Sequence, residues 1–294
     1  TIVETMKTEK ISVVLVVPRI LLSLEDGIVN EFRRKKLYTL LKALTSAAAA
    51  MPFSLRKYVF LPIHLRLGNG FKFFGVGGAP FDKQSELFWH RLGFLVLQGY
   101  GLTETSPAVT FNSPRKRKIG SVGTVLPGVE AITDEGNEIL VKGANVTQGY
   151  YKDEEKTKGA FSNGWLRTGD VGVFDKDGFL FLKGRSKDVI VTSEGLNVYA
   201  EDVEAVLNKM HGIKESAVIG IKAKEGEQVH AVVLTDLGDE ELSKVVAEAN
   251  KKLIDYQQIH DCTKWPYEDF PRTATLKVKK SLVQQHVLEK TPSK

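Results

Sequence analysis

The chain has 294 residues, of which 42% are hydrophobic and 26% are charged, a composition typical of folded globular proteins. This composition excludes a disordered chain and a collagen-like fibre. A single cysteine, Cys262, excludes a disulfide framework. The net charge of +5 is mild and dispersed over the sequence, so we expect no nucleic-acid partner.

The sequence predicts neither a membrane span nor a secretory signal. The most apolar run, residues 11–24, is interrupted by Pro18 and is shorter than the roughly 20 residues that a membrane-spanning helix needs. Glu4 interrupts the start, and no small-residue cleavage site follows it. We therefore expect a cytoplasmic protein. Since the chain begins at Thr1 with sequence typical of a domain interior, we also expect it to be a piece of a longer protein.

The first hundred residues predict alternating strands and helices. Residues 11–17 form a β-branched run that predicts a strand buried on both faces of a parallel sheet. Residues 25–50 predict a helix with one apolar face, made of Leu37, Leu40, Leu41 and Leu44.

Two further strands are expected at residues 71–76 and 94–97, and between them Asp82 is a good N-cap for a helix. The order strand, helix, strand predicts a parallel sheet with ligands at the carboxyl ends of its strands.

The pattern changes twice further along the chain. After about residue 110, frequent Gly, Asn and Asp turns predict a small antiparallel region of hairpins. From about residue 188 we expect a small α+β domain. Its predicted elements are a helix at 201–210 stopped by Gly212, strands at 216–221 and 229–234, and a helix at 240–253.

Three clusters carry residues suited to chemistry. The run from Gly99 to Glu104 could stack a base, bond a phosphate and hold a divalent cation through its carboxylate, or it is simply a tight turn with surface polar residues. Asp170 and Arg185 could hold ribose hydroxyls or a phosphate, or form a hairpin turn and an exposed charge. Lys277 could stabilise a developing oxyanion or belong to a solvated lysine-rich face.

Other chemistries find no support. The histidines and the cysteine show no metal-ligand spacing, and neither a Gly-x-Ser-x-Gly elbow nor a Gly-x-x-x-x-Gly-Lys-Ser/Thr loop occurs. The one dense basic run, Arg115 to Lys118, reads as an exposed loop, with contact to an anionic ligand or a membrane surface as the alternative.

Taken in order, six motifs resemble the second half of an AMP-forming acyl-CoA synthetase of the adenylate-forming superfamily, most closely the long-chain fatty-acid–CoA ligases. They are Gly77-Gly-Ala-Pro80, Gln98-Gly-Tyr-Gly-Leu-Thr-Glu104, Glu138 to Gly143 with Gly149-Tyr-Tyr151, Gly164 to Asp170, Gly184-Arg-Ser-Lys-Asp188 running to Glu204, and Pro271 to Lys277. The resemblance implies ATP-dependent activation of a fatty acid to acyl-AMP and transfer to coenzyme A, with Mg²⁺ bound.

The resemblance also implies roles for residues. In the earlier motifs Gly78 and Ala79 would line the adenine and acyl pocket, Tyr100 would stack on adenine beside Gly101, Thr103 would bond the α-phosphate, and Glu104 would bind Mg²⁺. Catalytic roles would fall to Thr103, Glu104 and the adenylation lysine.

In the later motifs Asp170 would hold the ribose hydroxyls beside Arg185, Gly195 would border the pantetheine channel, and Lys277 would be the adenylation lysine. Lys187 would be the hinge at which the C-terminal domain pivots.

On this basis we expect residues 1–186 to be the later part of the large domain, with a β-rich subdomain at about 110–186. Residues 188–294 would be the mobile C-terminal α+β domain. The family's T-S-G-T-T-G phosphate loop is absent from the sequence, and Leu276 replaces the glycine usual before the catalytic lysine.

Two alternatives stay open: a non-catalytic nucleotide- or acyl-binding module, and adenylation for loading a carrier protein. Acyl chain length and oligomeric state are not readable from the sequence.

Overall fold

The computed structural model describes residues 2–68, 70–273 and 277–290. The chain divides into two compact units, one made of Thr1–Thr168 and Gly172–Leu182, the other of Gly169–Val171 and Lys183–Lys294. The expected fold class, a mixed α/β chain with a parallel-sheet part, a small β region and a C-terminal α+β part, is confirmed.

The first unit begins with a five-stranded sheet in the order β1-β2-β3-β4-β5. Its first three strands are parallel, and the last two run antiparallel to their neighbours. The bounds are β1 Val13–Val16, β2 Phe73–Val76, β3 Leu95–Tyr100, β4 Thr110–Phe111 and β5 Thr124–Val125. Because parallel strands end at the same edge of a sheet, the glycine-rich segments that follow β2 and β3 leave it side by side.

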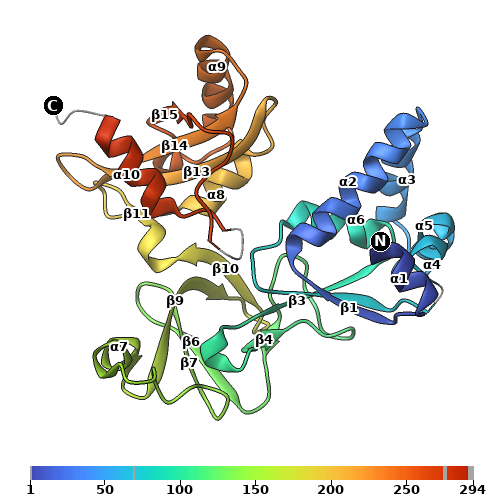
Figure 1. The fold of residues 1–294 in the computed structure, drawn as a ribbon, viewed down its shortest axis with the longest axis horizontal. Helices are drawn as coiled ribbons and strands as arrows, with labels where there is room; N and C mark the ends of the chain where they lie inside the picture. Colours follow the sequence, from blue (N-terminus) through green and yellow to red (C-terminus); the bar gives the residue numbers. More distant parts are fainter. Residues whose placement is uncertain (1, 69, 274–276, 291–294) are drawn as a thin grey trace. The chain divides into compact units, whose positions relative to one another are not determined.

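Six helices of this unit accompany that sheet, and α2 and α3 run next to each other (Figure 1). They are α1 Ile2–Thr8, α2 Pro18–Arg34, α3 Tyr38–Ala49, α4 Phe53–Val59, α5 Leu61–Leu67 and α6 Lys83–Arg91. Their apolar sides meet the strands in one core that contains Leu21, Leu41, Phe74, Trp89 and Phe94. Asp82 caps α6 as expected, because its carboxylate accepts hydrogen bonds from the amides of Gln84 and Ser85 at 2.8 and 3.0 Å.

The single helix expected at residues 25–50 is wrong. Two helices, α2 and α3, occupy this stretch and are separated at Lys36, whose φ of +57° lies outside the helical region. The expected apolar face is correct only in part, since Leu41 is buried but Leu37 and Leu40 are exposed.

The burial expected for the strand at residues 11–17 is also wrong. The strand forms as β1 and pairs in parallel with β2, but its side chains alternate between exposed and half-buried, and Leu15 is 78% exposed. The reason is position: β1 stands at the end of the strand order, and no described residue covers its second face.

The predicted hairpin region is confirmed between residues 129 and 185. A second sheet has the order β10-β9-β7-β6, with the short β8 paired to β9 and a small helix, α7 (Glu154–Ala160), beside it. The bounds are β6 Val129–Thr133, β7 Glu138–Gly143, β8 Phe161–Ser162, β9 Trp165–Phe174 and β10 Leu180–Arg185. β6 and β7 are antiparallel.

The second unit is built on a three-stranded sheet of β13, β14 and β15, with a small antiparallel pair, β11 and β12, before it. Its elements are β11 Val189–Val191, β12 Asn197–Tyr199, α8 Ala200–Leu207, β13 Ile213–Lys222, β14 Glu227–Thr235, α9 Asp239–Asn250, β15 Asp261–Lys264 and α10 Lys280–Lys290.

Successive side chains of β13 point to opposite faces of this sheet, and different helices pack on the two faces. Val218 packs with residues of α8 and α9, whereas its neighbours Ala217 and Ile219 pack with Val283 and Val287 of α10. The two predicted helices and two predicted strands of this unit are present. The first helix, α8, ends at Leu207 with Asn208 as its C-cap, so the stop expected at Gly212, which has φ +83°, is wrong by several residues. The strand β15 and the helix α10 were not predicted.

Candidate active site

The turn after β3 places a hydroxyl and a carboxylate at the edge of the parallel sheet. Gly101 admits no side chain, because an added Cβ would overlap the carbonyl oxygen of Pro107. The chain then forms a short 3₁₀ turn, Thr103–Thr105, which Thr105 closes by accepting a hydrogen bond from the Leu102 amide at 2.9 Å. Thr103 is exposed and Glu104 is half-buried, so both side chains are accessible from solvent.

Glu104 is held by residues more than forty positions later in the chain. The hydroxyl of Tyr150 donates a hydrogen bond to Glu104 Oε1 at 3.0 Å, and the Thr147 amide donates to the Glu104 carbonyl at 2.8 Å. Burial, and then the hydrogen bond to this carboxylate, raises the pKa of Tyr150 above its ordinary value. The phenol therefore stays protonated at neutral pH and acts as a donor.

The acidic side chain fits a magnesium ion that is shared with phosphates. Within the described ranges, no group of three or more His, Cys, Asp or Glu side chains is placed to hold a metal by itself. Mg²⁺ in nucleotide sites is typically bound through one or two carboxylates together with substrate phosphates and water. With Glu104 Oε1 engaged by Tyr150, Oε2 is the oxygen suited to such an ion.

The other residues predicted near adenine lie in the same unit but differ in exposure. Gly78, with φ +82°, is exposed in the turn after β2, and Ala79 beside it is half-buried. Tyr100 is only 7% exposed and packs in an apolar cluster with Val109 and Ile139. Its role as a stacking platform stays a prediction.

Asp170 and Arg185 lie together, as a shared ribose site would require. Arg185 Nε is 2.8 Å from Asp170 Oδ1, and the aspartate side chain is largely buried whereas the arginine is partly exposed. The two residues come from β9 and β10, fifteen positions apart in the sequence. Their contact places a carboxylate and a guanidinium at one point of the second unit.

Lys187 lies just before the short β11–β12 hairpin and Gly195 lies within it. Lys187 is exposed in a 3₁₀ turn, Ser186–Asp188, that precedes β11. Gly195 occupies the hairpin tip with φ +74°, and a Cβ there would meet no atom within 4 Å. The hinge and channel roles of these residues stay predictions.

Backbone hydrogen bonds hold Lys277 and its neighbour Lys279 against residues 271–273. Thr273 donates a backbone hydrogen bond to the Lys277 carbonyl at 2.8 Å, and Lys279 donates one to the Pro271 carbonyl at 2.7 Å. Arg272 anchors the incoming strand by ion pairs with Asp269 and Glu215. The Lys277 side chain is exposed. Leu276, the predicted departure from the family pattern, lies outside the described residues.

The predicted residues thus fall into two sets, each within one unit. Gly78, Ala79, Tyr100, Gly101, Thr103 and Glu104 belong to the first unit, and Asp170, Arg185, Lys187, Gly195 and Lys277 to the second. The Gly149-Tyr-Tyr151 motif by itself indicates no role for Tyr150. Only the fold reveals its contact with Glu104, since nothing in the spacing of the two residues indicates it.

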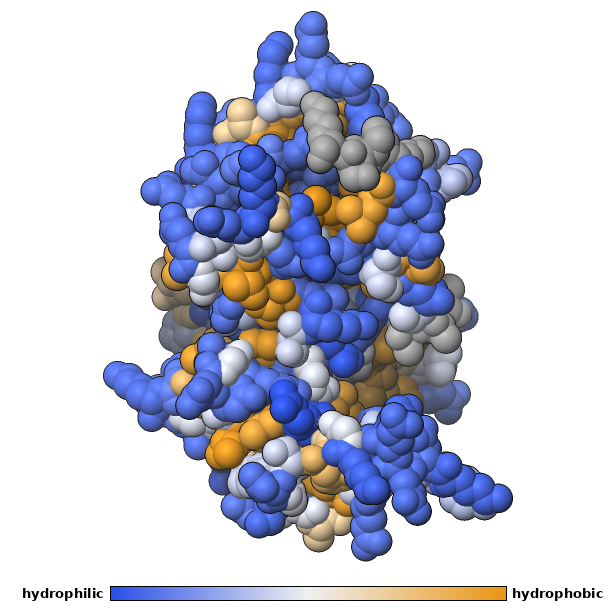
Figure 2. Space-filling model, turned by 90° about the vertical axis from the view of Figure 1, so that its left-hand side faces the viewer, coloured by the Kyte–Doolittle hydropathy of each residue, from blue (hydrophilic) through white to orange (hydrophobic). Residues whose placement is uncertain are grey.

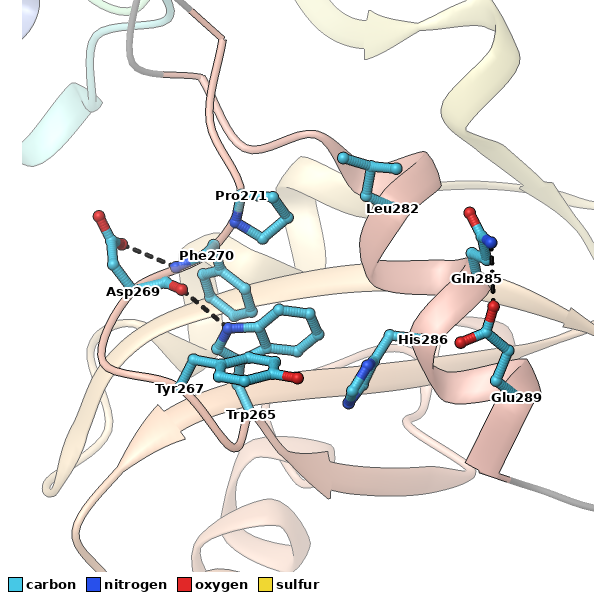
Figure 3. A pocket seen from close by; sticks show the side chains of 9 residues that line it. All are labelled: Trp265, Tyr267, Asp269, Phe270, Pro271, Leu282, Gln285, His286 and Glu289. Atoms are coloured by element: carbon cyan, nitrogen blue, oxygen red, sulfur yellow. Dashed lines mark hydrogen bonds between the residues drawn. The ribbon is translucent and has the colours of Figure 1, made fainter.

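A pocket of about 400 Å³ in the second unit was not predicted. Figure 3 shows Trp265, Tyr267 and Phe270 on one side and His286 of α10 on the other. The Trp265 and His286 rings are 4.8 Å apart, and the indole donates a hydrogen bond to the Asp269 carbonyl at 2.9 Å. The run of aromatic residues after β15 was the signal that could have indicated it.

The basic run is partly engaged within the protein. Lys118 forms ion pairs with Asp175 and Asp177, and Arg117 donates to the Pro114 carbonyl. Figure 2 shows one face of the molecule, on which hydrophobic residues form separate patches between hydrophilic ones. In the part of the chain that the structure covers, no helix is both long enough and apolar enough to cross a bilayer.

Comparison with known proteins places these features in context. A sequence model of the family described as AMP-binding enzyme matches residues 1–151. A long-chain-fatty-acid–CoA ligase of Mycobacterium bovis is 37% identical over 164 residues, which are 56% of this chain and 27% of that protein. A 2-succinylbenzoate–CoA ligase of Bacillus pumilus is 37% identical over 223 residues, covering 70% of this chain and 44% of that protein.

Solved structures show the same fold. O-succinylbenzoate coenzyme A synthetase from Bacillus subtilis, in complex with ATP and magnesium ion, is 26% identical with a TM-score of 0.71, over 96% of this chain and 53% of that one. ATP-bound MatB from Rhodopseudomonas palustris is 29% identical with a TM-score of 0.71, over 97% of this chain and 52% of that one. The chain therefore spans about half the length, or less, of the relatives it matches.

Proposed function

The chain belongs to the AMP-binding enzyme family, and from this premise we propose that it carries the adenosine and magnesium side of a fatty acyl-CoA ligase site. In the proposed reaction a fatty-acid carboxylate attacks the α-phosphorus of ATP, the new P–O bond forms, and pyrophosphate leaves. The sulfur of coenzyme A then bonds to the acyl carbon, AMP leaves, and the thiol proton passes to solvent.

The observation that carries this proposal is the turn after β3. An exposed threonine and a half-buried carboxylate follow a glycine that no side chain can replace, at the carboxyl edge of a parallel sheet. Attack of an anion on a polyanion requires cations and aligned donors more than it requires a base. Thr103 would bond the α-phosphate, and Glu104 would bind Mg²⁺, which when bound neutralises phosphate charge.

Further roles fall to residues of the second unit. Asp170 and Arg185 would hold the ribose, and Lys277 would donate to substrate oxygens as charge develops on the phosphate. Lys187 would be the hinge for movement of the C-terminal domain between the two half-reactions, and Gly195 would border the path of coenzyme A.

The long-chain preference rests on the motifs and on relatives such as the Mycobacterium bovis ligase. Similar identity to a 2-succinylbenzoate–CoA ligase means that a panel of acids is the appropriate test. Acyl-dependent ATP–pyrophosphate exchange should be measured with short to long fatty acids and with 2-succinylbenzoate, alongside calorimetric binding of AMP.

The result decides between the proposed function and its alternatives. Because the sequence lacks the T-S-G-T-T-G loop, we expect AMP binding with weak or no exchange from this chain alone. Exchange with one class of acid would identify the substrate. If the chain shows no AMP binding and no exchange, the proposal is contradicted. Transfer of the acyl group to a carrier protein but not to coenzyme A would favour carrier loading.

Peripheral membrane contact through the basic run is a separate proposal. Lys118 is engaged in ion pairs, so the appropriate change is Arg115→Glu with Lys116→Glu, which leaves those pairs intact. Reduced binding to anionic liposomes would support the contact, and unchanged binding would contradict it.

A further inference from the structure

We propose that Tyr150 is a positioning residue for the metal-binding carboxylate of the nucleotide site. Its hydroxyl holds Oε1 of Glu104 so that Oε2 is presented to the cation. This inference rests on the proposed function, because it takes Glu104 as the magnesium ligand.

The first step is the contact itself. Tyr150 donates to Glu104 Oε1 at 3.0 Å, and Thr147, three residues earlier, donates from its amide to the Glu104 carbonyl at 2.8 Å. One short segment thus fixes both the backbone and the side chain of the same glutamate. A carboxylate held at one oxygen has fewer rotamers to lose when its other oxygen binds a metal.

The second step is that Tyr150 is itself held from several sides. Its amide donates to Thr157 Oγ1 at 2.8 Å, and that hydroxyl donates to the Asp153 carbonyl, also at 2.8 Å. Gly149 lies against the same threonine, since an added Cβ would come within 2.6 Å of Thr157 Cγ2. The ammonium group of Lys156 lies 4.2 Å from the centre of the Tyr150 ring.

These contacts give the phenol a fixed place just before α7 and aim its hydroxyl at Glu104. A ring that served only to fill space would not need a donor there. The neighbouring Tyr151 is 89% exposed and so provides a matched control one position away.

The test uses the 294-residue chain with Mn²⁺ as the probe of the metal site and ATP as the nucleotide. Free Mn²⁺ is followed by electron paramagnetic resonance, and ATP binding is measured by calorimetry with and without the metal. The variants are Tyr150→Phe, Tyr151→Phe and Glu104→Gln, each checked by thermal melting followed by circular dichroism.

We expect Tyr150→Phe to weaken nucleotide-dependent Mn²⁺ binding about tenfold, while the affinity for metal-free ATP stays unchanged. Tyr151→Phe should match the unsubstituted chain, and Glu104→Gln should lose the metal dependence altogether.

Two results would overturn the positioning role alone. One is unchanged Mn²⁺ affinity in Tyr150→Phe when Glu104→Gln has lost it. The other is an equal loss of ATP affinity with and without metal, which would mean that the tyrosine only supports the local fold. Unchanged Mn²⁺ binding in Glu104→Gln would instead contradict the proposed function, and the absence of any nucleotide-dependent Mn²⁺ binding by the unsubstituted chain would overturn both.

Discussion

Lys280 Nζ lies 2.8 Å from Glu204 Oε1, and each of the two side chains is only 14% exposed. The pair joins the first residue of α10 to α8, and the same carboxylate oxygen accepts a hydrogen bond from the Val218 amide at 2.7 Å. Since Lys280 follows Lys277 by three residues, this ion pair also fixes the chain just after Lys277.

Removing one partner of the Lys280–Glu204 ion pair should lower the free energy of unfolding. Lys280→Met leaves Glu204 buried without its cation, so we expect the free energy of unfolding at pH 7 to fall by about 3 kcal/mol. Urea unfolding would measure it. Lys279→Met, at an exposed neighbouring lysine, is the control and should change little. The double variant Lys280→Met with Glu204→Gln should recover part of the loss, and no recovery would show that the charge of Glu204 is not the cause.

Lys277→Ala should impair one half-reaction only. If the lysine stabilises charge on the phosphate during adenylation, its removal should slow ATP–pyrophosphate exchange about a hundredfold. Thioester formation from preformed acyl-AMP should be spared. Both half-reactions should be measured in the longest form of the protein that shows exchange, with Lys279→Ala as the control. Equal loss of both steps would refute the assigned role.

Glu25→Gln should change stability in a pH-dependent way. Burial raises the pKa of Glu25 from 4.5 to about 7, with the charges of Asp26 and Asp82 acting in the same direction. The folded state therefore binds this proton more tightly than the unfolded state. The destabilising effect of the charge is absent below pH 4.5 and complete above pH 7. Glutamine should raise the free energy of unfolding by about 1–3 kcal/mol at pH 8 and by little at pH 4.

Glu31, on the same helix, provides the control of opposite sign. Hydrogen bonds from Lys35 and Arg66 lower its pKa to about 2. Its contribution to stability is present above pH 4.5 and is lost as the pH falls towards 2, so Glu31→Gln should destabilise the chain slightly at pH 8. Urea unfolding of both variants at pH 4 and pH 8 would test the pair. The same pH profile for both would contradict the burial argument.

Gly101→Ala should distort the turn before Thr103. The added methyl group would overlap the Pro107 carbonyl, a backbone atom that cannot move aside without shifting the loop. We expect a loss of about 1–3 kcal/mol in the free energy of unfolding, together with weaker AMP binding. Gly159→Ala in α7, where an added Cβ meets nothing within 4 Å, should be neutral or slightly stabilising. Equal effects at both positions would argue against a steric cause.

The sequence predicted element types well where the pattern was local. The cap at Asp82 and the paired strands β13 and β14 follow from turn chemistry and apolar periodicity. The predictions failed where the burial of a strand or the formation of a helix depends on the elements packed against it. A β-branched run predicts a strand that is buried on both faces, but β1 would be buried only if other elements of the chain packed against both of its faces. The helix α10 was missed because its apolar residues come in two adjacent pairs, of which Val283 and Val287 pack on the sheet while Leu282 and Leu288 stay exposed.

In the candidate site, too, some contacts could be predicted from the sequence and others could not. Motif order identified Asp170 and Arg185 as partners, and the structure places them in contact. The link between Tyr150 and Glu104 could not be predicted, because residues 46 positions apart meet only after the β-rich region has folded against the exit of β3.

The exposed strand β1 also determines how this chain will behave when it is concentrated. Val13, Leu15 and Val17 are exposed apolar residues on alternate positions, at the end of the strand order of the sheet. An apolar strand edge with open backbone donors and acceptors is a template for pairing with further polypeptide. Samples should therefore self-associate as concentration rises, and Leu15→Lys, which places a charge on the exposed face of this edge strand, should improve solubility without touching the nucleotide site.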